Sequence, residues 1–509
     1  MLTFGPLLSN GNSSLLIVLE MIPLCTSILL LAVPSLTLSN IRSIALNASL
    51  LTFVLSLPLY VLFDPTQTDF QFCYQLNSEY VQARLLNLSF GFGIDGLNVW
   101  LILLTTFLTP ICILVGWNMA HTPSIGSNKI TYLKTYCIIF LVIEVLLILA
   151  FTSRDIFVFY VFFEAVLVPM FFLLGMYGSQ PRNIRAAFKM FFYTLAGSLP
   201  MLAGIIMMVY NCGTTDYEVL SNSSLSHSRQ IIIFVLWFIG LSVKTPLIPM
   251  HGWLPETHAN APTSGSIILA GLLLKLGTYG MLRWLIGILP EACMYFTPMV
   301  NVICLVGVIY VSLITLRQVD IKKVIAYSSI AHMAVCVIGM FTFNVVGVSG
   351  SYLLMIGHGV ISPALFLCCG ILYDRYKTRI IFYYSGLAQT MPLFSTALLI
   401  LTMANMSLPI LSPTFAAEFL IFAGVFATNK LTAIAAATTM VLTGAYSLFL
   451  YNRICFGNVK SIYISKYSDL NRREFALLLP LVACCVILGV FPSIILDCCH
   501  NSIVLMLLR

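Results

Sequence analysis

Long apolar stretches recur along this 509-residue chain and constrain its fold more than any other feature. A helix that spans a membrane needs about 20 predominantly apolar residues. We expect fourteen stretches of about this length to form spanning helices, and no ten-residue segments of alternating polarity indicate a β-barrel. The stretches cover residues 14–35, 42–63, 97–118, 130–151, 154–177, 188–210, 231–250, 262–288, 297–316, 321–342, 344–373, 391–424, 430–452 and 475–496.

Charged residues are scarce, and their scarcity limits the classes of protein that this chain can be. Only 8% of the residues are Asp, Glu, Lys or Arg, whereas a soluble globular chain carries roughly 25%. This composition excludes a water-soluble enzyme, a disordered chain and a nucleic-acid binder, because too few polar groups exist to cover the surface. The longest polar loop, about residues 64–96, is too short to form a domain. We therefore expect residues 1–509 to form one all-α polytopic membrane domain.

Lysines and arginines gather in the loops that follow the odd-numbered stretches. Those loops hold 17 of the 25 basic residues, the other loops and ends hold 6, and the last 2 lie inside helices. Loops on the cytoplasmic or matrix side of a membrane are enriched in Lys and Arg. The asymmetry predicts that the odd-numbered loops face the cytoplasm or the mitochondrial matrix, and that both termini face the opposite side.

The sequence does not predict a redox centre or a nucleotide site. The 15 cysteines include no C-x-x-C and no Cys/His spacing typical of zinc or iron–sulfur sites, so we expect small buried side chains. Residues Gly91 to Gly96 match G-x-G-x-x-G, but this stretch opens an apolar helix and has no soluble βαβ unit around it. We therefore expect this chain to bind no cofactor and no metal, and to perform no redox chemistry or ATP hydrolysis.

Five charged residues lie inside apolar stretches, where a charge is costly. At the bilayer centre that cost is at least ~3 kcal/mol on insertion scales. We therefore expect all five to face the bundle interior, paired or hydrated, and the set favours conduction of protons or cations. Glu20, near the start of the first stretch, is expected to bridge helices or to snorkel instead. The five residues are Glu144, Glu164, Lys244, Lys275 and Glu418.

Glu164 and Lys244 show how such a set can move a proton. A Glu–Lys pair about 4 Å apart interacts by about 4 kcal/mol at an effective dielectric of 20. Movement of Glu164 toward or away from Lys244 would decide whether this lysine keeps its proton, and Lys275 on the next helix would receive it. Histidine titrates near neutrality, so His332 and His358 are candidate relays. The alternative interpretation, that both are hydrogen-bonded core histidines, stays open.

Two of the expected helices carry prolines beside a charged residue. Pro246 and Pro249 follow Lys244 in the seventh helix, and Leu408 to Pro413 precede Glu418 in the twelfth. Proline removes a backbone donor, and unwound backbone in a membrane survives only in a hydrated cavity or under a protein cover. An ordinary proline kink is the alternative. The five-helix spacing predicts two inverted repeats with broken helices, at residues 130–288 and 297–452.

Several long strings resemble a known family. SVKTPLIPMHGWLPETHANAPTSGS, LAGLLLKLGTYG, DIKKVIAYSSIAHM, MIGHG and FYVFFEAVLVP are similar to the antiporter-like membrane subunits of respiratory complex I. The resemblance extends from about residue 91 to residue 497. The acid at Glu418, with LYDRYKTR and YSLFLYNRICFGN, resembles the subunit 4 branch, since the subunit 2 and subunit 5 branches usually carry a lysine there.

This resemblance implies a role for each matching residue. Glu164 and Lys244 would be the charged pair of the first half-channel, Lys275 the central relay, and Glu418 the residue of the second half-channel. Glu144 matches an acid that many relatives carry in the fourth helix. One departure is Ala417, where the family usually has glycine, and another is the glycine-free stretch from Ile410 to Pro413.

The resemblance also implies a setting for the chain. It would be a proton-translocating subunit of the NADH:ubiquinone reductase in the mitochondrial inner membrane. NADH, FMN, iron–sulfur clusters and ubiquinone would be bound elsewhere in the complex. Expected partners are subunit 2-type and subunit 5-type neighbours and lipids, with no nucleic acid. Two alternatives remain, a subunit of a Na⁺/H⁺ antiporter and a purely structural membrane-arm subunit.

Overall fold

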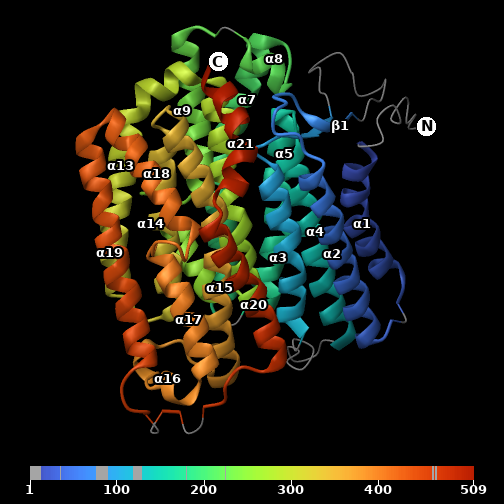
Figure 1. Cartoon of the computed structure of the whole chain (residues 1–509). Coiled ribbons are helices and arrows are strands. Elements are labelled where there is room, and N and C mark those ends of the chain that lie inside the picture. The colour runs from blue at the N-terminus through green and yellow to red at the C-terminus, as the bar shows by residue number, and fades with distance from the viewer. Residues whose placement is uncertain are drawn as a thin grey trace. The chain divides into compact units, whose positions relative to one another are not determined.

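The computed structural model describes residues 13–34, 36–75, 90–117, 129–178, 180–223, 225–460, 463–464 and 467–508. Long helices dominate it (Figure 1), and twelve helices in this described part are long and apolar enough to cross a membrane. The chain divides into two compact units. One contains Met1–Lys244, Tyr279–Tyr295 and Cys498–Arg509, and the other contains Thr245–Thr278 and Phe296–Asp497.

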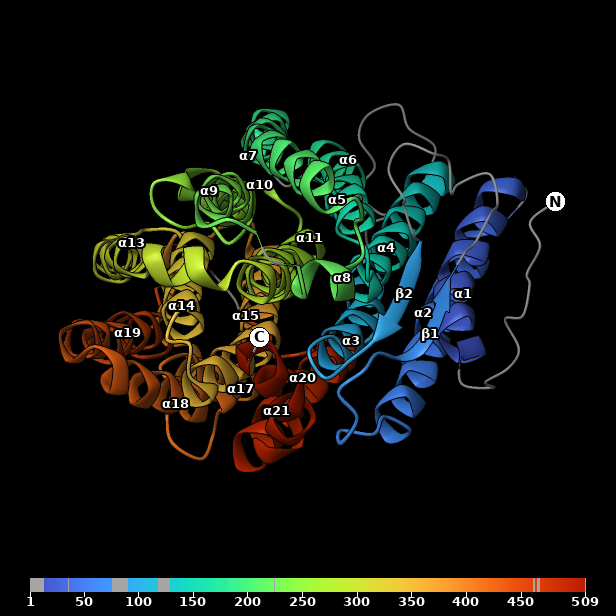
Figure 2. The ribbon, with the colours of Figure 1, turned by 90° about the horizontal axis from the view of Figure 1, so that it is seen from above.

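The first unit is a set of neighbouring helices with one small hairpin. Helix α1 packs on α2 and α4, α3 packs on α2 and α4, and α7 packs on α6 and α9 (Figure 2). Its elements are α1 (Ser13–Ala32), α2 (Leu38–Val61), β1 (Gln71–Gln75), β2 (Gly91–Ile94), α3 (Val99–Val115), α4 (Lys129–Thr152), α5 (Ile156–Ala165), α6 (Leu167–Tyr177), α7 (Asn183–Cys212), α8 (Tyr217–Ser221), α9 (His227–Lys244) and the π-helical η4 (Met281–Ile286).

The second unit is organised around α15, which is buried from Gly347 to Leu372 except at Ser349. This helix packs on α11, α14, α17, α18 and α20. The elements of the second unit are η2 (Met250–Trp253), α10 (Leu254–Asn260), α11 (Thr263–Ile268), the π-helical η3 (Leu269–Leu273), α14 (Ile321–Met340), α15 (Val345–Tyr376), η5 (Ile381–Tyr383), α16 (Leu387–Thr390), α17 (Pro392–Asn405), α18 (Pro413–Thr428), α19 (Lys430–Cys455) and α20 (Arg472–Val490). Three helices contribute to both units, α12 (Leu274–Gly280), α13 (Pro290–Leu316) and α21 (Ser493–Leu508).

The two expected breaks in helices are confirmed. Helix α9 ends at Lys244, before the two prolines, and the chain continues through a 3₁₀ turn into α10. Between α17 and α18, Ser407 and Ile410 have φ angles of 62° and 69°, which a helix cannot accommodate. The Thr414 hydroxyl donates a 2.7 Å hydrogen bond to the Ala404 carbonyl and so joins the two ends. The break therefore forms without the glycines usual in the family.

Several boundaries differ from the sequence-based prediction. The stretch 154–177 is two helices, because α5 ends at Ala165 and α6 begins at Leu167. The stretch 262–288 mixes α and π geometry, and the stretch 475–496 ends early and is followed by α21. The polar loop contains an antiparallel hairpin, in which Tyr74 pairs with Phe92. Apolar content indicates that a helix forms, but it does not report hydrogen-bond register or a short unwound link.

Candidate proton-transfer site

A row of four ionisable side chains crosses the second unit. The Nζ atom of Lys275 lies 2.8 Å from Nδ1 of His358, and the His358 and His332 ring centres are 5.9 Å apart. Nδ1 of His332 lies 3.3 Å from Oε1 of Glu418. These residues come from α12, α15, α14 and α18, and all four are buried. The structure thus brings four of the predicted residues into one row, in which only the step between the two histidines has no direct contact.

Irregular helix geometry places Lys275 at the start of this row. The lysine lies in the short α12, directly after the π-helical η3. Its Nζ also donates a 2.6 Å hydrogen bond to the Ala270 carbonyl, five residues earlier. A π-helical turn contains one more residue than an α turn and is often found at functional sites. The buried ammonium group therefore has one backbone acceptor and one imidazole acceptor.

Polar groups surround the other end of the row. Glu418 follows the N-terminal turn of α18, and the Tyr446 hydroxyl lies in its electrostatic field. Asn405 and Ser328 lie close to that hydroxyl. A cavity of about 10 Å³ borders Tyr446, Asn405 and Ser328, which is close to the volume that one water molecule needs. Tyr446, Asn405 and Ser328 thus supply polar groups near Glu418 in addition to His332.

Glu164 and Lys244 lie near each other in the first unit but are separated. The Lys244 Nζ donates a 2.8 Å hydrogen bond to the Phe163 carbonyl and lies 3.9 Å from the centre of the Phe163 ring. Each charge lies in the electrostatic field of the other. Among the ion pairs of the described residues, however, none joins these two side chains. Lys244 therefore contacts the backbone beside Glu164 instead of its carboxylate.

The two remaining acids have hydroxyl partners. Oε1 of Glu144, on α4, accepts a 2.7 Å hydrogen bond from the Thr52 hydroxyl of α2. Glu20 is buried and accepts a hydrogen bond from the Tyr74 hydroxyl of the hairpin. The structure thus supports the bridging role that was expected for Glu20, with the hairpin as its partner. Glu144 belongs to the first unit, whereas the row that contains Lys275 belongs to the second.

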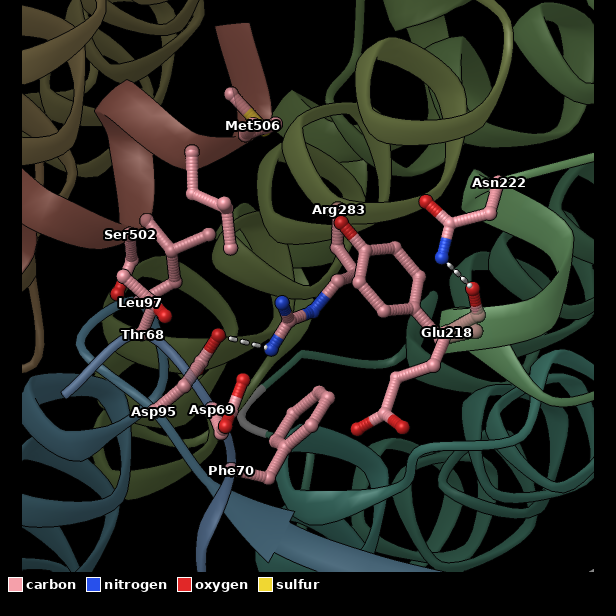
Figure 3. Close-up of a pocket in the computed structure, with 12 residues that line it drawn as sticks. Thr68, Asp69, Phe70, Asp95, Leu97, Glu218, Asn222, Arg283, Ser502 and Met506 are labelled. Carbon is pink, nitrogen blue, oxygen red and sulfur yellow. Dashed lines mark hydrogen bonds and ion pairs between the residues drawn. The ribbon is translucent and has the colours of Figure 1, made fainter. Parts of the chain in front are cut away.

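The sequence did not indicate a polar cluster around Arg283, which is one of the six basic residues assigned above to the other loops and ends. Arg283 is only 4% exposed, and its Nη2 lies 2.5 Å from Oδ2 of Asp95 (Figure 3). Its guanidinium group also lies over the Phe70 and Tyr217 rings, at 4.9 and 4.8 Å. A pocket of about 150 Å³ adjoins the pair. The available signal was an arginine inside an apolar stretch.

The fold and the buried row define a class of protein. A bundle of spanning helices, broken beside ionisable residues and crossed by a connected row of lysine, histidine and glutamate, is typical of ion-translocating membrane proteins. The chain belongs to the NADH:quinone oxidoreductase/Mrp antiporter membrane family, whose model matches residues 153–443.

Individual relatives agree with this assignment. The chain is 49% identical to NADH-ubiquinone oxidoreductase chain 4 of Marchantia polymorpha, over 95% of each chain. It is also 49% identical to the protein of that name from Arabidopsis thaliana, over 94% of each. A chain of respiratory complex I from Thermus thermophilus has a TM-score of 0.83 at 27% identity, covering 97% of this chain and 99% of that one. A chain of the Mrp complex from Dietzia has a TM-score of 0.81 at 17% identity, covering 97% of each, and shows the shared fold alone.

Proposed function

We propose that this chain translocates protons as a membrane-arm subunit of the H⁺-translocating NADH:ubiquinone oxidoreductase, complex I. The observation that carries this proposal is the connected row from Lys275 through His358 and His332 to Glu418. A charged side chain buried in a membrane costs free energy, so such residues usually have a function. Its similarity to complex I chain 4 proteins over most of its length supports the assignment to the complex.

The row supports a stepwise transfer. Protonated Lys275 donates its Nζ proton to Nδ1 of His358. The His358 ring can then release a different proton from its Nε2 atom. Glu418 accepts a proton from Nδ1 of His332 and is left neutral. The two rings are 5.9 Å apart between centres, so a water molecule or a ring rotation has to carry the proton across this step. Each transfer conserves charge within the row.

The pair in the first unit would control entry to the row. At its observed position Lys244 is held by the Phe163 carbonyl. Movement of the Glu164 carboxylate to about 4 Å would stabilise protonated Lys244 by about 4 kcal/mol at an effective dielectric of 20. Withdrawal of Glu164 would release that proton toward Lys275. Glu144, which accepts a hydrogen bond from Thr52, would be a further proton site on α4.

The setting of the chain follows from the same assignment. We place it in the mitochondrial inner membrane, with the basic odd-numbered loops in the matrix and both termini in the intermembrane space. Residues 130–288 and 297–452 would be the two inverted repeats. NADH, FMN, iron–sulfur clusters and ubiquinone would be held by other subunits, and subunit 2-type and subunit 5-type chains would be the neighbours. In the described residues, no group of three His, Cys, Asp or Glu side chains is placed to hold a metal.

The experiment compares proton pumping with electron transfer in the intact complex. Lys275→Met and Glu418→Gln should leave assembly intact and lower the number of protons moved per NADH. Lys323→Met is the control, because this lysine is 37% exposed and pairs with Asp320 at the surface. Normal stoichiometry in assembled Lys275→Met complex would favour a purely structural subunit. Sodium-dependent transport without NADH dehydrogenase comigration would favour the antiporter alternative.

A further inference from the structure

A pocket at the end of α19 has no role in the proton-transfer site. It has a volume of about 840 Å³ and lies wholly in the second unit. Arg453 in the last turn of α19 and Lys460 after it supply two positive charges. The rest of the wall consists of aromatic and polar residues, one glycine and one valine, with no acid: Phe382, Ser385, Phe449, Asn452, Phe456, Gly457, Asn458, Val459 and Tyr463.

The two cations are positioned by the structure and have no carboxylate partner among the described residues. The Arg453 guanidinium carbon lies 5.2 Å from the centre of the Phe449 ring. The Lys460 Nζ donates a 2.7 Å hydrogen bond to the Phe382 carbonyl and lies 4.1 Å from the Phe382 ring centre. Both groups retain N–H donors for an external anion. The pocket therefore carries a local excess of positive charge.

The backbone that bears Lys460 is tied to a second segment. Gly457 has a φ of 92°, a conformation that glycine adopts without steric cost, and it turns the chain at the end of the helix. The Ser385 hydroxyl donates a 2.6 Å hydrogen bond to the Asn458 carbonyl, and the Gly386 amide bonds to the Phe456 carbonyl at 3.2 Å. These hydrogen bonds hold the two segments that form the wall of the pocket in fixed positions.

An apolar stripe on α19 leads into this pocket. Ile434, Val441 and Leu448 are 66%, 75% and 46% exposed. They are seven residues apart, so they follow one face of the helix. Asn452, four residues after Leu448, continues this face and lines the pocket, and the half-exposed Phe449 lines it beside Asn452. Membrane proteins commonly place Trp and Tyr at the level of the lipid headgroups, and the exposed Tyr463 lies in the wall of the pocket with Phe382 and Phe456.

We propose that this pocket binds the phosphate of an anionic phospholipid whose acyl chains lie along the α19 stripe. Basic pockets at the ends of spanning helices attract anionic headgroups, and each nearby cation strengthens the attraction. Guanidinium donors form charge-assisted hydrogen bonds with phosphate oxygens. The combination of two cations without an acid and an adjoining stripe of alkyl side chains fits a ligand with an anionic head and long apolar tails. A zwitterionic headgroup would place its own cation beside Arg453 and Lys460, and the repulsion would weaken its binding.

The test uses the purified intact complex and photoactivatable phosphatidylglycerol in nanodiscs. Lipid cross-links to the peptide containing Phe449–Lys460 should fall by about fivefold for each cation removed, in Arg453→Gln and Lys460→Gln. Arg453→Lys keeps the charge and should retain most cross-links, which separates loss of charge from loss of folding. The control is Arg317→Gln with Arg472→Gln, since both arginines are exposed and lie outside the pocket.

Three results would overturn the proposal. One is equal labelling by photoactivatable phosphatidylcholine, which would show a lipid-facing surface without selectivity for anions. A second is displacement of the lipid by millimolar inorganic phosphate, which would show a site for soluble anions. The third is that the peptide cross-links to a neighbouring subunit instead of lipid, which would show a protein interface.

Discussion

Nζ of Lys275 and Nδ1 of His358 are 2.8 Å apart inside a fully buried part of the second unit. Two adjacent buried cations repel each other and lose hydration, so this pair is stable when it shares a single excess proton. The next element of the row, His332, is not hydrogen-bonded to His358. Its ring centre lies 5.9 Å away. The two contacts of the row at 2.8 and 3.3 Å thus flank one longer step between the histidines.

The longer step makes His332 a specific target. His332→Gln removes a group that can both accept and release a proton, and positioned acid–base groups commonly contribute about 100-fold to rate. We expect proton transfer through this chain to slow by about that factor while the complex still assembles. The measurement is the number of protons per NADH in proteoliposomes. His227→Gln is the control, because His227 is exposed and pairs with Glu291 at the surface. Unchanged stoichiometry in His332→Gln would contradict the proposed route.

The separation of Glu164 from Lys244 predicts sensitivity to side-chain length. Aspartate is one methylene shorter, so Glu164→Asp should keep the charge but shorten the reach of the carboxylate. We expect Glu164→Asp to lower pumping partially and Glu164→Gln to lower it fully, with normal assembly in both. Protons per NADH are again the readout, and Glu291→Gln serves as an exposed control. Full pumping by Glu164→Gln would show that the carboxylate charge is not required.

The Arg283–Asp95 pair predicts a stability effect that is independent of pumping. Removal of one partner from a buried ion pair typically costs about 3–5 kcal/mol, because the other charge stays buried. Arg283→Met or Asp95→Asn should therefore lower the melting temperature of the complex, and Arg283→Met with Asp95→Leu should recover part of the loss. Differential scanning fluorimetry of the purified complex measures this. Equal destabilisation by the double variant and the single variants would argue against pairing as the cause.

His258 predicts a pH dependence in α10, which lies outside the candidate spans. Burial, with a smaller contribution from the Lys322 charge, lowers the pKa of His258 from 6.5 to about 3. The unfolded state therefore binds a proton below pH 6.5 that the folded state does not, and stability falls as the pH decreases from 6.5 toward 3. At pH 5 the expected loss is about 2 kcal/mol.

Hydrogen exchange of the peptide containing Leu254–Asn260 measures this loss. The His258 ring stacks on Phe366 with centres 4.6 Å apart, so His258→Phe should preserve packing and remove the acid-dependent increase in exchange. An unchanged pH dependence in the variant would assign it to another group.

The sequence predicted the helices better than it predicted their contacts. Apolar length alone identified the spanning segments, and proline beside Lys244 or Glu418 identified the two breaks, because both signals are local. The connection from Lys275 to Glu418 joins residues that are far apart in sequence, and only tertiary packing sets its distances. The Arg283–Asp95 pair was missed for a further reason, because an arginine near the end of an apolar stretch is also typical of a loop.

The π-helical η3 before Lys275 has a consequence for the phase of the helix. An α-helix turns by about 100° per residue, so one additional residue within a turn rotates every following side chain by about that angle. Deletion of one residue between Leu269 and Leu273 would restore regular α geometry and would turn Lys275 away from His358. The direction in which this lysine points thus depends on the number of residues before it as well as on its identity.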